Sequence, residues 1–126
     1  MKWLILILLV AMGYIRFAPS DPTRWHRPVE GQADRDWPNG VLRLTGASLA
    51  DLDAVARDWP RTKLLAGSVE EGRVTYVTRT ALWGFPDYTT VEARETGSAI
   101  YARLRFGRSD FGVNGRRVAQ WLAALR

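Results

Sequence analysis

The chain has 126 residues, of which 47% are apolar and 25% charged, a composition typical of one globular domain rather than of a disordered chain. It contains no cysteine, which excludes disulfides, thiolate metal sites and a cysteine nucleophile. The formal net charge of +5 is carried almost wholly by arginine, and Lys2 and Lys63 are the only lysines. Arginine favours forked contacts with carboxylates and phosphates, although a GC-rich genome produces the same bias with no function attached.

The N-terminus has the pattern of an export signal or a membrane anchor. Lys2 precedes an uninterrupted apolar run over residues 3–15, which Arg16 closes. As a helix this run spans about 20 Å, short of the roughly 30 Å hydrocarbon core of a bilayer. Because the Arg16 side chain can extend towards the headgroups, a short membrane anchor over residues 3–18 is the alternative to a signal peptide.

Cleavage and orientation of this segment also stay open. Residues 11–13 and 18–20 both place small side chains at a plausible spacing for cleavage, but neither is a clean A-x-A site and Pro19 weakens the second. We expect residues 1–17 to form a signal peptide or membrane anchor. The expected location is the bacterial cell envelope, with the rest of the chain either held in the periplasm by an inner-membrane anchor or secreted there.

Residues 18–40 carry four of the six prolines, mixed charges and little periodicity, which predicts an extended tether. The only histidine, His26, lies here and has no partners for a metal site or a catalytic triad. Trp25 is either an interfacial anchor or packs on the domain. We expect a domain over residues 41–126, with no metal and no cofactor.

The first elements of this domain are a short strand and a helix. Residues 41–44 predict the strand. Ser48 is a good helix N-cap with Asp51 in capping-box position. Apolar residues then follow at helical spacing until Pro60 ends the helix; they are Leu49, Leu52, Val55, Ala56 and Trp59.

Four strands and a final helix complete the predicted domain. Turn-forming sequences separate the strands, which are predicted over residues 63–69, 73–83, 88–94 and 98–106. The last helix has an apolar stripe, with Asn114 as candidate N-cap and Asp110 as an earlier alternative. The order β-α-β-β-β-β-α predicts an α+β fold with a curved antiparallel sheet and both helices on one face, TBP-like in outline. A two-layer sandwich of another topology is the alternative.

Alternation in the last strand predicts two different sheet faces. The apolar face, expected to meet the helices, has Ile100, Ala102, Leu104 and Phe106. The other face, expected to meet solvent or a partner, has Tyr101, Arg103 and Arg105, and we add Asp87, Tyr76 and Arg94 as sheet-face candidates. An RNA or DNA platform would need aromatic pairs that this pattern lacks, and an exported location argues against a nucleic-acid partner.

The residues from Arg105 to Val118, together with the turn Phe85-Pro86-Asp87, resemble a known family. They are similar to the closing signature, roughly S-x-S-R-x-G-x-S-D-x-G-x-N-x-x-R, of domain-of-unknown-function family 1499 of bacteria and plastids. The resemblance covers about residues 40–126. Ala102 and Leu104 stand where that pattern has serines, and Tyr88 stands where a second aspartate is common. The family has no established activity, so the resemblance implies a fold and domain limits only.

The densest polar cluster lies in this signature and has two interpretations. Its members are Arg105, Ser109, Asp110, Asn114 and Arg117. As a structural corner, the aspartate and asparagine satisfy free backbone N–H groups and an arginine clamps the aspartate. As a binding site, a helix N-terminus with flanking arginines would hold a phosphate or carboxylate.

Two functions follow from these observations. The first is a non-enzymatic binding or interaction module of the envelope, with a small anion, a lipid headgroup or an envelope protein as partner. The alternative is a small acid–base hydrolase or lyase that uses Asp87 or Asp110. Ser109 has no histidine nearby in the chain to activate it, and the phosphate-loop and dinucleotide fingerprints are missing. We therefore assign no catalytic residue.

Overall fold

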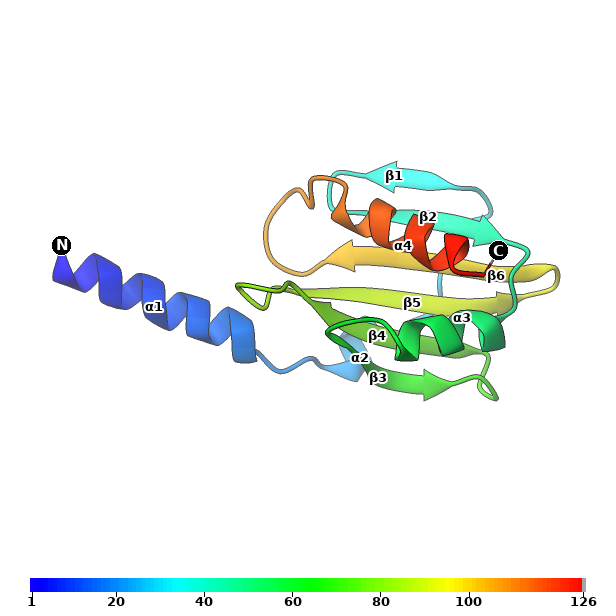
Figure 1. Ribbon diagram of the computed structural model, residues 1–126, viewed down its shortest axis with the longest axis horizontal. Helices are drawn as coiled ribbons and strands as arrows, with labels where there is room; N and C mark the ends of the chain where they lie inside the picture. The colour runs from blue at the N-terminus through cyan, green and yellow to red at the C-terminus, as the bar shows by residue number, and fades with distance from the viewer. Residues whose placement is uncertain (126) are drawn as a thin grey trace.

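The computed structural model describes residues 1–125, which form four helices and one six-stranded sheet (Figure 1). The helices are α1 (Lys2–Phe17), α2 (Pro22–Trp25), α3 (Leu49–Arg57) and α4 (Val113–Ala123). The strands are β1 (Arg35–Trp37), β2 (Gly40–Thr45), β3 (Thr62–Ser68), β4 (Arg73–Arg79), β5 (Pro86–Arg94) and β6 (Gly97–Leu104). The α+β class predicted from the sequence is confirmed.

The sheet is antiparallel throughout, with strand order β1-β2-β6-β5-β4-β3. The central hairpin of β5 and β6 turns at Gly97, whose φ of 142° is accessible to glycine but strained for other residues. A Cβ at this position would lie 2.0 Å from the carbonyl oxygen of Thr45 on β2. Glycine therefore allows the hairpin turn and the neighbouring strand to approach each other closely.

Helices α3 and α4 cover one face of the sheet, which we call the helix side (Figure 1). Ser48 caps α3 as predicted, and its hydroxyl accepts from the backbone N–H of Asp51 at 3.1 Å. Trp121 of α4 is fully buried, and its ring meets the ring of Tyr76 edge-on at 5.8 Å. The main core lies here and includes Val41, Leu52, Val74, Val91, Ile100 and Val118.

The opposite face of the sheet is covered by residues 18–31, which we call the covering segment. The ring of Trp25 stacks on that of Tyr88 at 4.0 Å, and Val29 is buried against β2 and β6. Arginines of the sheet donate to backbone carbonyls of the segment, for example Arg103 to Trp25 at 2.6 Å. The sequence predicts an extended tether over residues 18–40. In the structure, residues 18–31 of this stretch instead pack against the sheet through these long-range contacts.

Strand β1 is the second feature of residues 18–40 that differs from the tether predicted from the sequence. It extends the sheet at one edge, where Arg35 pairs with Leu42 and Trp37 with Gly40. Its three residues are too few to show an alternating pattern. The ring of Trp37 meets that of Tyr101 edge-on at 5.7 Å and anchors the strand.

Several element ends differ from the prediction. Strand β4 ends at Arg79 rather than at residue 83, because Thr80 bonds back to Phe85 and Gly84 to Thr80 and close a loop. Strand β6 ends at Leu104 rather than at residue 106. Helix α4 begins at Val113 with Gly112 as its N-cap, so neither Asn114 nor Asp110 holds that position.

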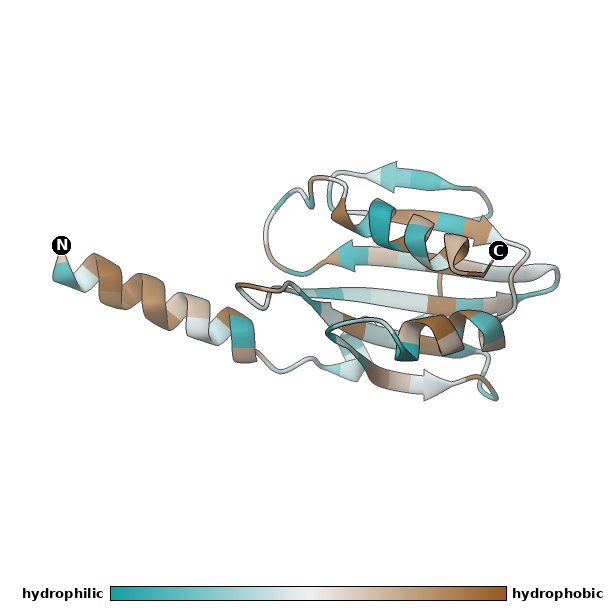
Figure 2. Cartoon of the chain, viewed as in Figure 1, coloured by the Kyte–Doolittle hydropathy of each residue, from teal (hydrophilic) through white to brown (hydrophobic). Residues whose placement is uncertain are grey.

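The predicted N-terminal helix is present as α1, which extends away from the sheet (Figure 1) and is apolar along most of its length (Figure 2). Within the described chain none of its residues is buried. Its C-terminal end is held by Arg16, which donates to the carbonyl oxygen of Leu82 at 3.1 Å, and by Arg79, which donates to that of Ile15 at 3.2 Å. Among residues 1–125 there is no helix with both the length and the hydropathy needed to cross a membrane.

Candidate functional site

The polar cluster predicted from the sequence divides between the two faces of the sheet. Asp110, Asn114 and Arg117 meet Asp87 on the helix side. Arg105 lies on the opposite face, beside the covering segment. The remaining member, Ser109, is exposed and only accepts from the backbone N–H of Phe111 at 3.2 Å.

The helix-side members form a buried corner. Arg117 donates to Oδ2 of Asp87 at 3.0 Å and to Oδ1 of Asn114 at 2.6 Å. The amide Nδ2 of Asn114 donates to Oδ2 of Asp110 at 2.9 Å and, less closely, to Oδ2 of Asp87 at 3.4 Å. Burial raises the pKa of Asp87, although the Arg117 guanidinium and the Asn114 amide act in the opposite direction. The corner brings together the two carboxylates of the acid–base hypothesis.

Asp110 also caps helix α4 from outside it. Its carboxylate accepts from the backbone N–H groups of Gly112 at 2.8 Å and of Asn114 at 3.1 Å. These donors have no partner inside the helix. The arginine of the corner clamps Asp87 rather than Asp110. Within the described residues, the side chains of Asp87, Asp110, Asn114 and Arg117 all have hydrogen-bond partners inside the domain, which is the pattern expected of a structural corner.

Two of the predicted sheet-face residues lie on the helix side. Asp87 pairs with Leu104 across the β5–β6 ladder and points to the helices. Tyr76 donates its hydroxyl to Asp53 of α3, and burial raises its pKa. Tyr101, Arg103 and Arg94 point to the opposite face, as predicted, but the covering segment lies over that face.

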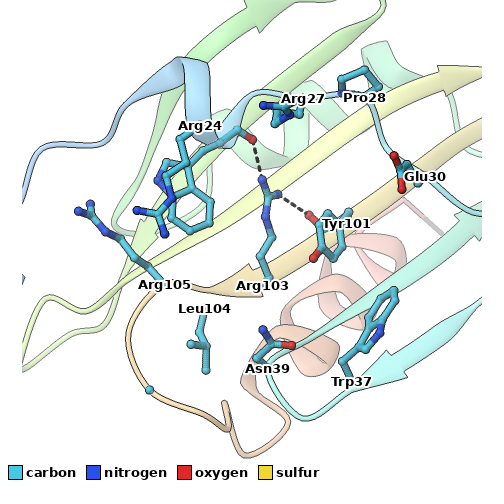
Figure 3. A pocket seen from close by; sticks show the side chains of 12 residues that line it. Arg24, Arg27, Pro28, Glu30, Trp37, Asn39, Tyr101, Arg103, Leu104 and Arg105 are labelled. Atoms are coloured by element: carbon cyan, nitrogen blue, oxygen red, sulfur yellow. Dashed lines mark hydrogen bonds between the residues drawn. The ribbon is translucent and has the colours of Figure 1, made fainter.

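A cleft of 550 Å³ lies between the covering segment, strand β6 with the start of the loop that follows it, and the end of β1 with the turn after it (Figure 3). We call it the arginine cleft. Its lining residues are Arg24, Trp25, Arg27, Pro28, Glu30, Trp37, Asn39, Tyr101, Arg103, Leu104, Arg105 and Gly107. Four of them are arginines and Glu30 is the one acid, so the cleft carries an excess of positive charge.

Arg103 extends from β6 towards the covering segment and is 7% exposed. Its guanidinium donates to Oγ1 of Thr90 and to the carbonyl oxygens of Tyr101 and Trp25, at 2.9, 3.0 and 2.6 Å. All three acceptors are neutral. Burial lowers the pKa of Arg103 to about 10, which leaves the side chain charged at neutral pH. A buried cation without a carboxylate favours an anion nearby.

Among the described residues, the other arginines of the cleft also have no carboxylate partner. Arg105 donates to the carbonyl oxygen of Pro19 at 2.7 Å and to the Tyr88 hydroxyl at 3.1 Å. Arg24 lies over the Trp25 ring at 4.7 Å. Within residues 1–125, none of the four cleft arginines takes part in an ion pair.

At the other end of the same face, the arginines do have a carboxylate partner. Glu92 accepts from Arg73 at 2.8 Å and from Arg94 at 3.2 Å. Burial opposes ionisation of Glu92, but these bonds and one from the Val29 N–H lower its pKa. Next to this cluster, burial and the charge of Arg73 lower the pKa of His26. The fold thus neutralises one end of this face and leaves the cleft end positive.

The sequence analysis missed Arg24 and Arg27 as cleft residues because they lie in the predicted tether. A signal was present, since Arg24-Trp25-His26-Arg27 places two guanidiniums around an aromatic ring within four residues. Nothing in that segment indicates which strand it approaches. The partner of Trp25 is Tyr88, far along the chain.

A family model described as "Protein of unknown function (DUF1499)" matches residues 18–125. The chain belongs to this family. The match confirms the resemblance inferred from the closing signature, and it begins where the covering segment begins. No curated protein and no solved structure matched the chain.

Proposed function

We propose that this domain is a non-enzymatic module of the cell envelope that binds a small anionic ligand in the arginine cleft. The observation that carries the proposal is Arg103, a buried guanidinium whose hydrogen-bond acceptors are all neutral, beside three further arginines that make no ion pair within residues 1–125. At about 4 Å, a unit anion gains about 4 kcal/mol from one such charge at the effective dielectric near a protein surface. Phosphate and carboxylate groups both match the forked geometry of arginine.

The envelope location rests on α1. Its side chains are apolar and exposed, with Leu4, Ile7 and Val10 each more than half exposed, so water is an unfavourable environment for the helix. Export through the helix, or insertion of its apolar surface among lipids, would remove that cost. A C-terminal fusion to alkaline phosphatase, which is active only outside the cytoplasm, tests the location: activity is expected, and an inactive, stable fusion would contradict it.

The acid–base alternative ranks second. Its support is the raised pKa of Asp87 and the shared contact of Asp87 and Asp110 with Asn114. A catalytic carboxylate must reach its substrate, yet Asp87 is 6% exposed and held by Arg117. The alternative predicts a large loss of activity in Asp87→Asn. The binding proposal predicts unchanged anion binding in that variant, because Asp87 is on the helix side.

The test of the proposal is calorimetric titration of the full chain in mild detergent with inorganic phosphate and, separately, with malonate. Saturable binding is expected for at least one of the two probes. Arg27→Gln should weaken it about tenfold or more, because a charge-assisted hydrogen bond contributes about 1.5–3 kcal/mol. Arg27 is exposed, so this change leaves the packing intact.

Lys63→Gln is the matched control, since it removes one exposed positive charge outside the cleft. It should leave both affinities within about twofold of wild type. Absence of saturable binding to either probe would refute the proposal. Equal weakening by the two variants would also refute it, because the binding would then depend on net charge rather than on the cleft.

A further inference from the structure

The end of the domain from which α1 emerges (Figure 1) exposes large apolar side chains. Two loops form this end: residues 80–85 between β4 and β5, and residues 105–112 between β6 and α4. The loops expose Leu82 (71%), Trp83 (47%) and Phe111 (86%). We call these three residues the apolar tips.

The base of α1 is in contact with both loops. Arg16 donates to the carbonyl oxygen of Leu82 at 3.1 Å, and the ring of Tyr14 meets that of Phe106 edge-on at 6.4 Å. Gly84 packs so closely on α1 that a Cβ there would lie 2.8 Å from Cγ of Arg16. Any surface that receives α1 therefore also faces the apolar tips.

Phe111 is unusual in both its backbone and its exposure. Its φ is 52°, in the left-handed region that favours glycine and is disfavoured for a bulky residue. Its ring gains little from packing, since the side chain is almost fully exposed. Folding alone explains neither the residue type nor the strain, whereas a surface that buries the ring would.

Charge is also distributed unevenly along the strands. The α1 end carries the exposed arginines Arg16, Arg108 and Arg116. The opposite end, formed by the β3–β4 and β5–β6 turns, exposes Glu70, Glu71 and Glu95. The domain thus presents apolar groups and positive charge at one end and negative charge at the other.

We propose that the α1 end of the domain docks on the surface of a bilayer that contains anionic phospholipids, with the apolar tips inserted at the interface. Tryptophan, phenylalanine and leucine are the side chains that partition at this depth, and nearby arginines add attraction to anionic headgroups. The proposal rests on the insertion of α1 among lipids that is considered under the proposed function. It adds a second membrane contact, which is made by the apolar tips. It orients the strands roughly along the membrane normal and places the acidic turns at the end far from the membrane.

Single-cysteine probes can test this contact, because the chain has no cysteine of its own. Leu82→Cys and Phe111→Cys report on the tips, Ile7→Cys on α1, and Glu95→Cys is the matched control on an exposed turn at the far end. Each full-length variant is labelled with an environment-sensitive fluorophore. It is then mixed with vesicles of phosphatidylcholine and phosphatidylglycerol that contain a nitroxide-labelled lipid as quencher. Circular dichroism verifies that each variant keeps the wild-type melting temperature.

The expected result is quenching at positions 7, 82 and 111 and little at position 95. Arg108→Gln should lower partitioning about fivefold, since one basic residue near an anionic surface contributes about 1 kcal/mol, and should have little effect with phosphatidylcholine alone. Quenching at position 7, with positions 82 and 111 as unquenched as position 95, would overturn the docking while the membrane association of α1 stands. No quenching at position 7 would overturn both the docking of the apolar tips and the membrane association of α1. Energy transfer between labelled copies at position 111 without vesicles would assign the tips to a protein contact and overturn the proposal.

Discussion

Replacing Asp110 by alanine tests whether the buried corner is a folding device. The carboxylate accepts three hydrogen bonds, from the N–H groups of Gly112 and Asn114 and from the Asn114 side-chain amide. Loss of a helix cap costs about 1 kcal/mol, and a buried amide left without its acceptor costs about 1–3 kcal/mol. The amide keeps a longer contact with Asp87 at 3.4 Å, so we take the lower part of that range. The expected loss in the free energy of unfolding is about 2–3 kcal/mol.

The assay is thermal unfolding of the full chain, followed by circular dichroism. At roughly 4 °C per kcal/mol for a domain of this size, Asp110→Ala should melt about 8–12 °C below wild type. Ser109→Ala is the control, because Ser109 is exposed and accepts a single hydrogen bond; it should melt within about 2 °C of wild type. A melting temperature of Asp110→Ala equal to or above that of wild type would refute the structural role and make the corner the first place to search for a ligand.

Three further predictions concern the covering segment and Glu92, a residue of β5 that it contacts. Trp25→Ala removes the ring that stacks on Tyr88 and should lower the free energy of unfolding in urea by about 2 kcal/mol; no change would mean that the segment is a free tether. His26, the only histidine, has a lowered pKa, so the folded chain binds its proton less tightly than the unfolded chain. Stability should therefore rise as the pH rises towards and past 6.5, and an NMR titration of His26 with a midpoint at or above that value would contradict this. Glu92 has a lowered pKa, so its contribution is present above pH 4.5 and lost as the pH falls through the folded pKa. Glu92→Gln should reduce stability at neutral pH and flatten this acid slope, and an unchanged slope would show that Glu92 is not its source.

Local sequence patterns determined much of the fold. Helix α3 is predicted by the Ser48 cap and the apolar spacing that follows, both of which act within a few residues. The strands from β3 to β6 are predicted because alternation and turn residues are also local properties. The closing signature pointed to Asp110, Asn114 and Arg117, which the structure brings together in the corner. The TBP-like outline stays a prediction.

Only the tertiary structure decided what covers the second face of the sheet. Residues 18–31 have no periodicity, and their stability comes from contacts such as Trp25 on Tyr88 and Arg103 on the Trp25 carbonyl. Those partners are more than sixty residues away in the chain. Local patterns are set by the geometry of one element, whereas such contacts are selected by the total burial of the folded chain.

The same reason explains the location of the candidate site. The sequence places Arg103 and Arg105 on one strand face, but cannot show that Arg24 and Arg27 arrive opposite them and form a cleft. It also cannot show that the tips of two separate loops lie at the base of α1. Residue types and the period of each strand are properties of the chain, while the meeting of distant segments depends on how the sheet and its covering segment pack together.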